Sequence, residues 1–135
     1  MNMVSFRYTL FSAILAFCLW GGWALHVNYA LDPIYGLRAG LVQGSMSFIF
    51  TILMIHLLAF IYRHSPKKIR SFLPPILTVC CTGTLLYIVH TLVHTPDVLK
   101  TIAPPIAVAL NFCWFTNSKF SVSESEKNER RYPTT

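Results

Sequence analysis

The pattern of charged and apolar positions divides this chain into four long charge-free stretches. Asp, Glu, Lys and Arg are absent from residues 8–31, 39–62, 71–96 and 101–118. Each stretch is mostly apolar and about long enough to cross a bilayer as a helix, which takes roughly 20 residues. The pattern therefore predicts an all-α polytopic membrane protein, a bundle of four transmembrane helices.

We expect one transmembrane domain over 1–120, with spans at 8–30, 39–62, 72–94 and 98–117. Pro104-Pro105 falls several residues into the fourth span. Either that helix is kinked there or it is short and begins at the prolines, and the short helix is the simpler account. Residues 121–135 are polar and mixed in charge, which predicts a disordered cytoplasmic tail.

The placement of the 11 Lys and Arg residues predicts the orientation of the bundle. With four spans, only Arg38 and Lys100 lie on one side of the membrane. The others share the opposite side: Arg7, Arg63, Lys67, Lys68, Arg70, Lys119, Lys127, Arg130 and Arg131. Because cytoplasmic loops are rich in Lys and Arg, both termini and the central loop are predicted to be cytoplasmic.

Composition narrows the classes of function. The formal net charge is +6, but the cations flank apolar spans, so membrane lipids rather than nucleic acid are the expected partners. No carboxylate lies deep in a span, which disfavours a proton relay through Asp or Glu. The chain also lacks the sequence motifs of nucleophile elbows, P-loops and zinc proteases, so a non-enzyme without a cofactor is favoured.

Gly36, Gly40 and Gly44 recur at four-residue spacing along one helix face. Small residues at this spacing allow a second helix to approach closely. The face could form a homodimer seam or pack against another span of the same chain. The packing alternative is favoured because every helix of a small bundle needs such a face.

Several polar residues are candidates for binding a phosphate-headed lipid. Arg38 stands near the non-cytoplasmic surface, where its guanidinium could bind phosphate; the alternative is a membrane anchor paired with Asp32. In the central loop, cations could bind the phosphate or only set topology. The whole candidate set comprises Arg38, Gln43, His56, Arg63, Lys67, Lys68, Asn111 and Asn117.

Three histidines form a candidate metal site. His90 and His94 are four residues apart, so both share one helix face, and His26 approaches the same membrane surface. A third ligand from His26 or Asp97 would complete the site. Hydrogen bonding of these histidines to water or headgroups is the favoured alternative.

The end of the fourth span carries a family resemblance. Asn111-Phe112, then Asn117, Lys119 and Phe120, resemble the terminal span of the GtrA-like family of small four-span proteins. Membership would imply a bacterial inner-membrane protein that moves polyprenyl-phosphate-linked sugars. Because four helices make a thin wall, such a protein is expected to form a homodimer or to act with a partner membrane protein such as a glycosyltransferase.

These observations leave three hypotheses of different classes. The first is a protein that translocates or handles a polyprenyl-phosphate-linked sugar or another phosphate-headed lipid. The second is a non-catalytic accessory subunit of a larger membrane complex. The third is a small membrane enzyme with a histidine-based metal site.

Overall fold

The computed structural model describes residues 3–131, which form four helices. They are α1 (Met3–Tyr29), α2 (Pro33–His64), α3 (Leu73–Leu92) and α4 (Val98–Arg131). Each is long and apolar enough to cross a membrane. The predicted all-α bundle of four transmembrane helices is confirmed, and the chain is a small integral membrane protein.

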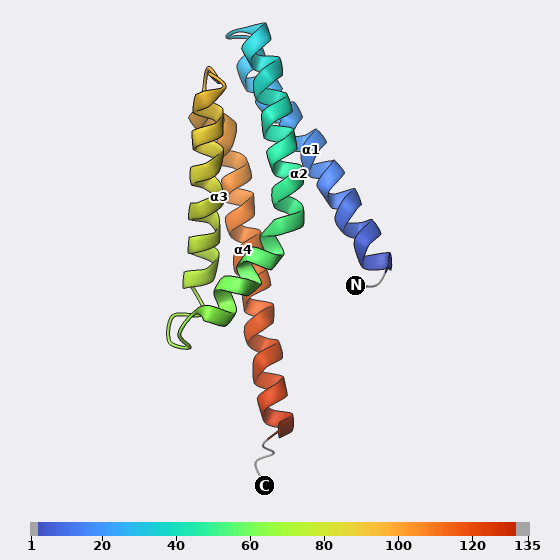
Figure 1. Ribbon diagram of the computed structural model, residues 1–135, viewed down its shortest axis with the longest axis vertical. Helices are drawn as coiled ribbons and strands as arrows, with labels where there is room; N and C mark the ends of the chain where they lie inside the picture. Colours follow the sequence, from blue (N-terminus) through green and yellow to red (C-terminus); the bar gives the residue numbers. More distant parts are fainter. Residues whose placement is uncertain (1–2, 132–135) are drawn as a thin grey trace.

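The described chain begins and ends toward the same end of the bundle, where the connection at 65–72 also lies (Figure 1). We call this the N/C end, and we call the other end, with the connections at 30–32 and 93–97, the loop end. Near the loop end α1 packs along α2, and it diverges from the bundle toward Met3 (Figure 1). The cytoplasmic position of the N/C end stays a prediction.

Helix α2 begins six residues before the predicted span. Asp32 caps it, because its Oδ1 accepts hydrogen bonds from the backbone amides of Ile34 (2.9 Å) and Tyr35 (3.0 Å). Pro33 follows the cap, where a missing N–H costs nothing. The carboxylate of Asp32 therefore caps the N-terminus of α2.

The glycines of α2 pack against α1 of the same chain. Gly21 of α1 faces Gly40 and Gly44, and a Cβ built on Gly21 would lie 2.9 Å from the Gly40 carbonyl oxygen. Gly36, which lies within α2, packs in the same way against the backbone of Tyr29. The glycine face of α2 therefore packs against another helix of the same chain, which is the second of the two alternatives.

Toward the N/C end the buried apolar cluster is formed by α2, α3 and α4. Leu58 of α2, Val79 of α3 and Cys113 of α4 form a buried apolar cluster, and Phe120 packs against it. α2 bends past its midpoint and crosses toward α3 and α4, as Figure 1 shows. This half of the bundle is therefore built on three helices, while the first helix diverges.

The fourth helix begins at Val98 and contains Pro104 and Pro105 in its interior. The expected short helix that begins at the prolines is wrong. Pro104 cannot donate to the carbonyl of Lys100, four residues earlier, and the indole Nε1–H of Trp23 donates to that carbonyl instead (3.0 Å). A side chain from α1 thus replaces the backbone hydrogen bond that proline removes.

We expect Trp23→Phe to lower the free energy of unfolding by about 1 kcal/mol, because it leaves the Lys100 carbonyl without a donor. Pro104→Ala restores a backbone N–H to this carbonyl, so Trp23→Phe should cost less in the Pro104→Ala background. Unfolding of the four proteins in mixed micelles measures this difference. Equal costs in both backgrounds would show that the indole acts by packing alone.

Helix α4 continues to Arg131, so the expected disordered tail is wrong for residues 121–131, while residues 132–135 lie outside the described region. Glu124 pairs with Arg70 of the connection between α2 and α3, at 3.0 Å. The hydroxyl of Ser125 also donates to the Ser121 carbonyl one turn earlier. The ion pair ties this polar extension of α4 to the rest of the bundle.

Candidate functional site

A crevice of about 280 Å³ lies in the middle of the bundle, just below the roughly 300–1,000 Å³ of typical ligand pockets. From α1 it is lined by residues 12–20, on the side of this helix toward Met3. All four helices contribute to its wall: Ser12, Ala16, Trp20, Ser47, Phe50, Thr51, Met54, Thr82, Leu86, Pro105, Ile106, Val108, Ala109 and Phe112.

The crevice wall is apolar although it contains hydroxyl groups. The Thr51 hydroxyl donates to the Ser47 carbonyl (2.7 Å), and the Thr82 hydroxyl donates to the Thr78 carbonyl (2.9 Å). The Ser47 hydroxyl oxygen accepts from the side-chain amide of Gln43 (3.3 Å). These three groups are bonded within the chain, and apart from the Ser12 hydroxyl and the Trp20 indole N–H the rest of the wall is apolar. The crevice is therefore suited to a hydrocarbon chain rather than to a polar ligand.

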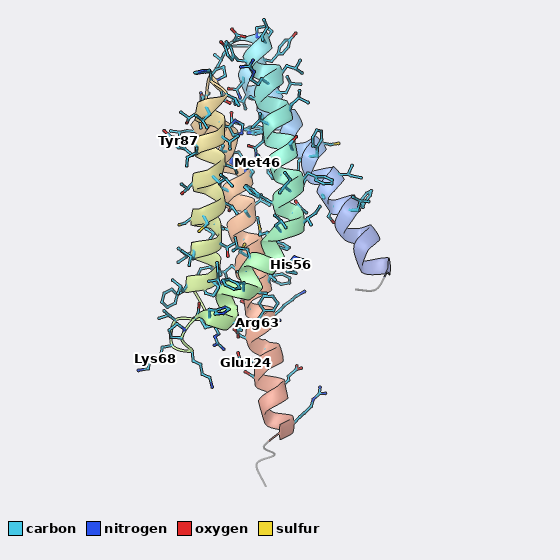
Figure 2. All side chains as sticks on the ribbon, in the orientation of Figure 1. Met46, His56, Arg63, Lys68, Tyr87 and Glu124 are labelled. Atoms are coloured by element: carbon cyan, nitrogen blue, oxygen red, sulfur yellow. The ribbon has the colours of Figure 1, made fainter. Side chains whose placement is uncertain are left out.

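Cations gather at the N/C end, where α2 meets the connection to α3. Arg63, Lys67 and Lys68 are exposed. Neither of the two ion pairs found among residues 3–131 involves them. Figure 2 labels Arg63 at the end of α2 and Lys68 on the connection. These three side chains can therefore bind an anionic group from outside the chain.

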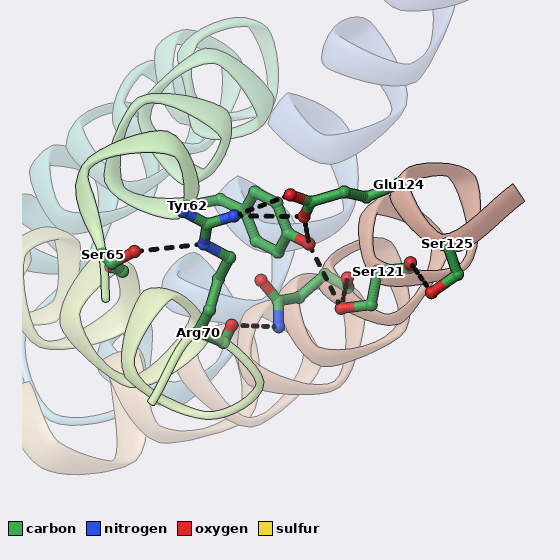
Figure 3. Close-up of polar contacts among 7 residues, drawn as sticks. Tyr62, Ser65, Arg70, Ser121, Glu124 and Ser125 are labelled. Atoms are coloured by element: carbon green, nitrogen blue, oxygen red, sulfur yellow. Dashed lines mark hydrogen bonds and ion pairs between the residues drawn. The ribbon is translucent and has the colours of Figure 1, made fainter. Parts of the chain in front are cut away.

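The fourth cation of this region, Arg70, is occupied inside the protein (Figure 3). Its Nη1 donates to both carboxylate oxygens of Glu124 (3.0 and 3.1 Å), and its Nε donates to the Ser65 carbonyl (3.1 Å). The Tyr62 hydroxyl also donates to Glu124 (2.8 Å), and the guanidinium lies 5.0 Å from the Tyr62 ring centroid. Arg70 is therefore a structural tie, whereas the other three cations have no ion-pair partner among the described residues. Hydrogen bonds from Tyr62 and Arg70 lower the pKa of the Glu124 carboxyl, and Lys67 lies near enough to help lower it.

Asn117, a candidate ligand-binding residue, is buried and holds the 65–72 connection. Its Nδ2 donates to the carbonyls of Arg70 (3.1 Å) and Ser71 (2.9 Å). Its Oδ1 is buried and has no hydrogen-bond partner among the described residues. The amide therefore supports the geometry of the cationic connection rather than facing the crevice.

Gln43, another candidate, lies in a buried polar network with His90. The Gln43 amide donates to Ser47, so its Oε1 accepts from His90 Nε2 (2.7 Å). His90 Nδ1 then accepts from the Thr95 hydroxyl (2.8 Å). Both side chains are fully buried, and the network joins α2 to the end of α3.

The three candidate metal ligands do not come together. Both ring nitrogens of His90 are engaged, whereas His26 and His94 are exposed. His26 lies beside Trp23, and His94 beside Tyr35. Across the described part of the chain, no three His, Cys, Asp or Glu side chains are placed to share a metal ion. The geometry therefore gives the predicted histidine site no support.

The remaining candidates, Arg38, His56 and Asn111, are exposed on the outside of the bundle. The Arg38 guanidinium lies 5.6 Å from the centroid of the Tyr35 ring. His56 Nδ1 donates to the carbonyl of Ile52 (3.2 Å), and Figure 2 shows His56 on the edge of α2 nearer to α1. The structure therefore places none of the three in the crevice wall.

Sequence reasoning missed a second polar network at the loop end. Asn28 Nδ2 donates to the Ala24 carbonyl (2.8 Å) and to the Thr101 hydroxyl (2.7 Å), and Asn28 Oδ1 accepts from the Asp97 amide (2.8 Å). A hydrogen bond from the Lys100 ammonium holds the pKa of Asp97 below its usual value. The network ties α1 to the start of α4. An asparagine next to the predicted span end was the only signal for it.

In comparisons with known proteins, no family model matches this chain, no curated protein matches its sequence and no solved structure matches its fold.

Proposed function

We propose that this small membrane protein binds a phosphate-headed lipid and takes part in its movement across the membrane. The observation that carries the proposal is the apolar crevice shared by all four helices. Its wall is suited to a hydrocarbon chain, because the hydroxyls of Thr51 and Thr82 are bonded to their own helices. The exposed cations at the N/C end supply the complementary site for a phosphate.

The distance between these two features fits one lipid molecule. Along α2, Met54 in the crevice wall and Arg63 at the N/C end are separated by at most about 14 Å at the helical rise, and by less along the bundle axis because α2 bends in this half (Figure 1). Half the hydrocarbon thickness of a bilayer is about 15 Å. A lipid with its phosphate beside Arg63 can therefore extend its chain to the depth of the crevice.

The charge distribution and the fourth span support a polyprenyl-phosphate-linked sugar as the lipid class. With the N/C end in the cytoplasm, Arg63, Lys67 and Lys68 face the cytoplasmic leaflet, where they can bind the phosphate of such a lipid. The resemblance of Asn111–Phe120 to the GtrA-like terminal span points to the same class. The buried amide of Asn117 gives one of those residues a structural role, since it holds the cationic connection in place.

Lipid retention by purified protein tests the proposal. We expect native mass spectrometry to detect bound polyprenyl phosphate and little bound polyprenol, which lacks the phosphate. The triple variant Arg63→Gln/Lys67→Gln/Lys68→Gln should weaken binding on the order of a hundredfold, because each cation near an anionic headgroup contributes about 1 kcal/mol. The control, Arg38→Gln/Lys100→Gln, removes charge at the loop end and should bind normally.

The crevice is tested by filling it. Ala109→Phe places a ring in the crevice wall, whereas Leu110→Phe changes the next residue, which lies outside that wall. We expect Ala109→Phe to abolish retention of polyprenyl phosphate and Leu110→Phe to leave it unchanged, at equal thermal stability. Normal binding by Ala109→Phe and by the triple variant would overturn the proposal.

A further inference from the structure

Asn111 is a polar side chain that faces away from the bundle at the depth of the bilayer. Along α4 it lies about 16 Å from Lys100 and about 9 Å from Asn117, inside a stretch without charged residues. It is exposed, whereas Cys113 and Thr116 are buried on the opposite side of the helix. Polar residues inside membrane spans usually face the bundle interior or a cavity.

The amide of Asn111 is only partly satisfied by its own helix. Its Nδ2 donates one hydrogen bond, to the carbonyl of Ala107 (2.8 Å). Among the described residues the second N–H and Oδ1 have no bond. In hydrocarbon each of these groups lacks the water that would satisfy it on a soluble protein. The unsatisfied N–H and Oδ1 of Asn111 therefore indicate a polar partner within the membrane.

The residues around Asn111 allow a second helix to approach closely. Ala103 and Ala107 precede it at four-residue intervals and are exposed on the same side of α4. Small residues at this spacing bring two backbones together, and an asparagine among them can bond across the contact. The glycines of α2 are already used against α1, so this face of α4 is a separate contact surface.

We propose that this face, formed by Ala103, Ala107 and Asn111, is a homodimer interface in the membrane. The choice of a second copy rests on two observations. A carboxamide carries both a donor and an acceptor, so two Asn111 side chains can bond to each other across a two-fold axis. Two copies inserted in the same orientation also place Asn111 at the same depth, which an unrelated partner need not do.

The exposed side chain of His56 cannot bond to its own copy across a two-fold axis as Asn111 can. Because Nδ1 of a neutral His56 donates to the Ile52 carbonyl, its Nε2 is an acceptor only. Two such acceptors cannot bond to each other across a two-fold axis. This difference favours Asn111 on α4 over His56 on α2 as the self-pairing residue.

Dimerisation in lipid vesicles tests the inference. Two fluorophore-labelled populations are mixed in vesicles of phosphatidylethanolamine and phosphatidylglycerol, and energy transfer is measured as the protein-to-lipid ratio is varied. We expect the wild-type protein to dimerise and Asn111→Leu to weaken dimerisation about tenfold, the usual effect of one interhelical side-chain hydrogen bond in model helices. Asn111→Gln keeps an amide at this depth and should retain part of the affinity.

Two further variants distinguish a specific effect on the interface from a general effect of replacing a polar residue in a span. Ala107→Leu widens the contact without removing the amide, and it should also weaken dimerisation. Thr84→Leu makes a similar polar-to-apolar change at an exposed position of α3 and should dimerise like wild type. A monomeric wild type, or equal affinities for wild type, Asn111→Leu and Ala107→Leu, would overturn the inference. Lipid binding at the crevice is measured separately, so either proposal can fail alone.

Discussion

Alanine at Gly36 is expected to lower the free energy of unfolding by about 1–3 kcal/mol, the usual cost of overpacking a close contact. A Cβ there would lie 2.7 Å from the backbone nitrogen and Cα of Tyr29, closer than real Cβ atoms approach. These are backbone atoms, so no flexible side chain can move aside. The helices α1 and α2 would have to separate where they now pack most closely.

The adjacent glycines of α1 provide a matched comparison. A Cβ at Gly21 would lie 2.9 Å from the Gly40 carbonyl oxygen, whereas a Cβ at Gly22 meets nothing within 4 Å. We therefore expect Gly21→Ala to destabilise the protein and Gly22→Ala to be neutral or stabilising, since alanine favours helix over glycine. Reversible unfolding in mixed micelles would measure the three variants. Equal stability of Gly21→Ala and Gly22→Ala would contradict close packing of α1 on α2.

Leucine at Gln43 is expected to have the second large effect, again about 1–3 kcal/mol, because it leaves the Nε2–H of His90 buried without an acceptor. The bond from His90 Nε2 to Gln43 Oε1 is 2.7 Å long, and both side chains are fully buried. Water cannot replace the lost partner at this place. His90→Leu should cost a similar amount, because it leaves Gln43 Oε1 without its donor.

A double-mutant cycle isolates the contribution of this contact. Gln43→Leu combined with His90→Leu removes both polar partners, so it should cost less than the sum of the single variants, by about 1 kcal/mol. Exposed His56 supplies the control, and His56→Leu should leave stability unchanged or higher. Additive single effects would show that the two side chains contribute independently.

The fold was readable from the sequence because membrane insertion depends on local properties of a segment. A stretch such as 39–62, without charge and about 20 residues long, must form a helix to satisfy its backbone in hydrocarbon. The limits of the helices were less predictable. Pro104 suggested a helix start, yet α4 continues through it because Trp23 from another helix donates to the freed carbonyl of Lys100.

The roles of the polar residues could not be assigned from the sequence. Four of the candidates are isolated polar residues in apolar spans: Gln43, His56, Asn111 and Asn117. The sequence does not indicate whether each side chain faces the bundle interior or the lipid. In a soluble helix the polar face marks the outside, but in a membrane span both faces are apolar. The structure buries Gln43 and Asn117 in contacts within the chain and leaves His56 and Asn111 exposed.

The sequence by itself determined that the chain crosses the membrane with four helices, because the energetic cost of placing charge in hydrocarbon depends on each segment alone. It also confined the cations to the segments between spans. Only the tertiary structure decided which helices approach closely, where the crevice lies and which polar groups are satisfied. These features depend on contacts between residues far apart in the chain, such as Asn28 with Thr101 and Gln43 with His90.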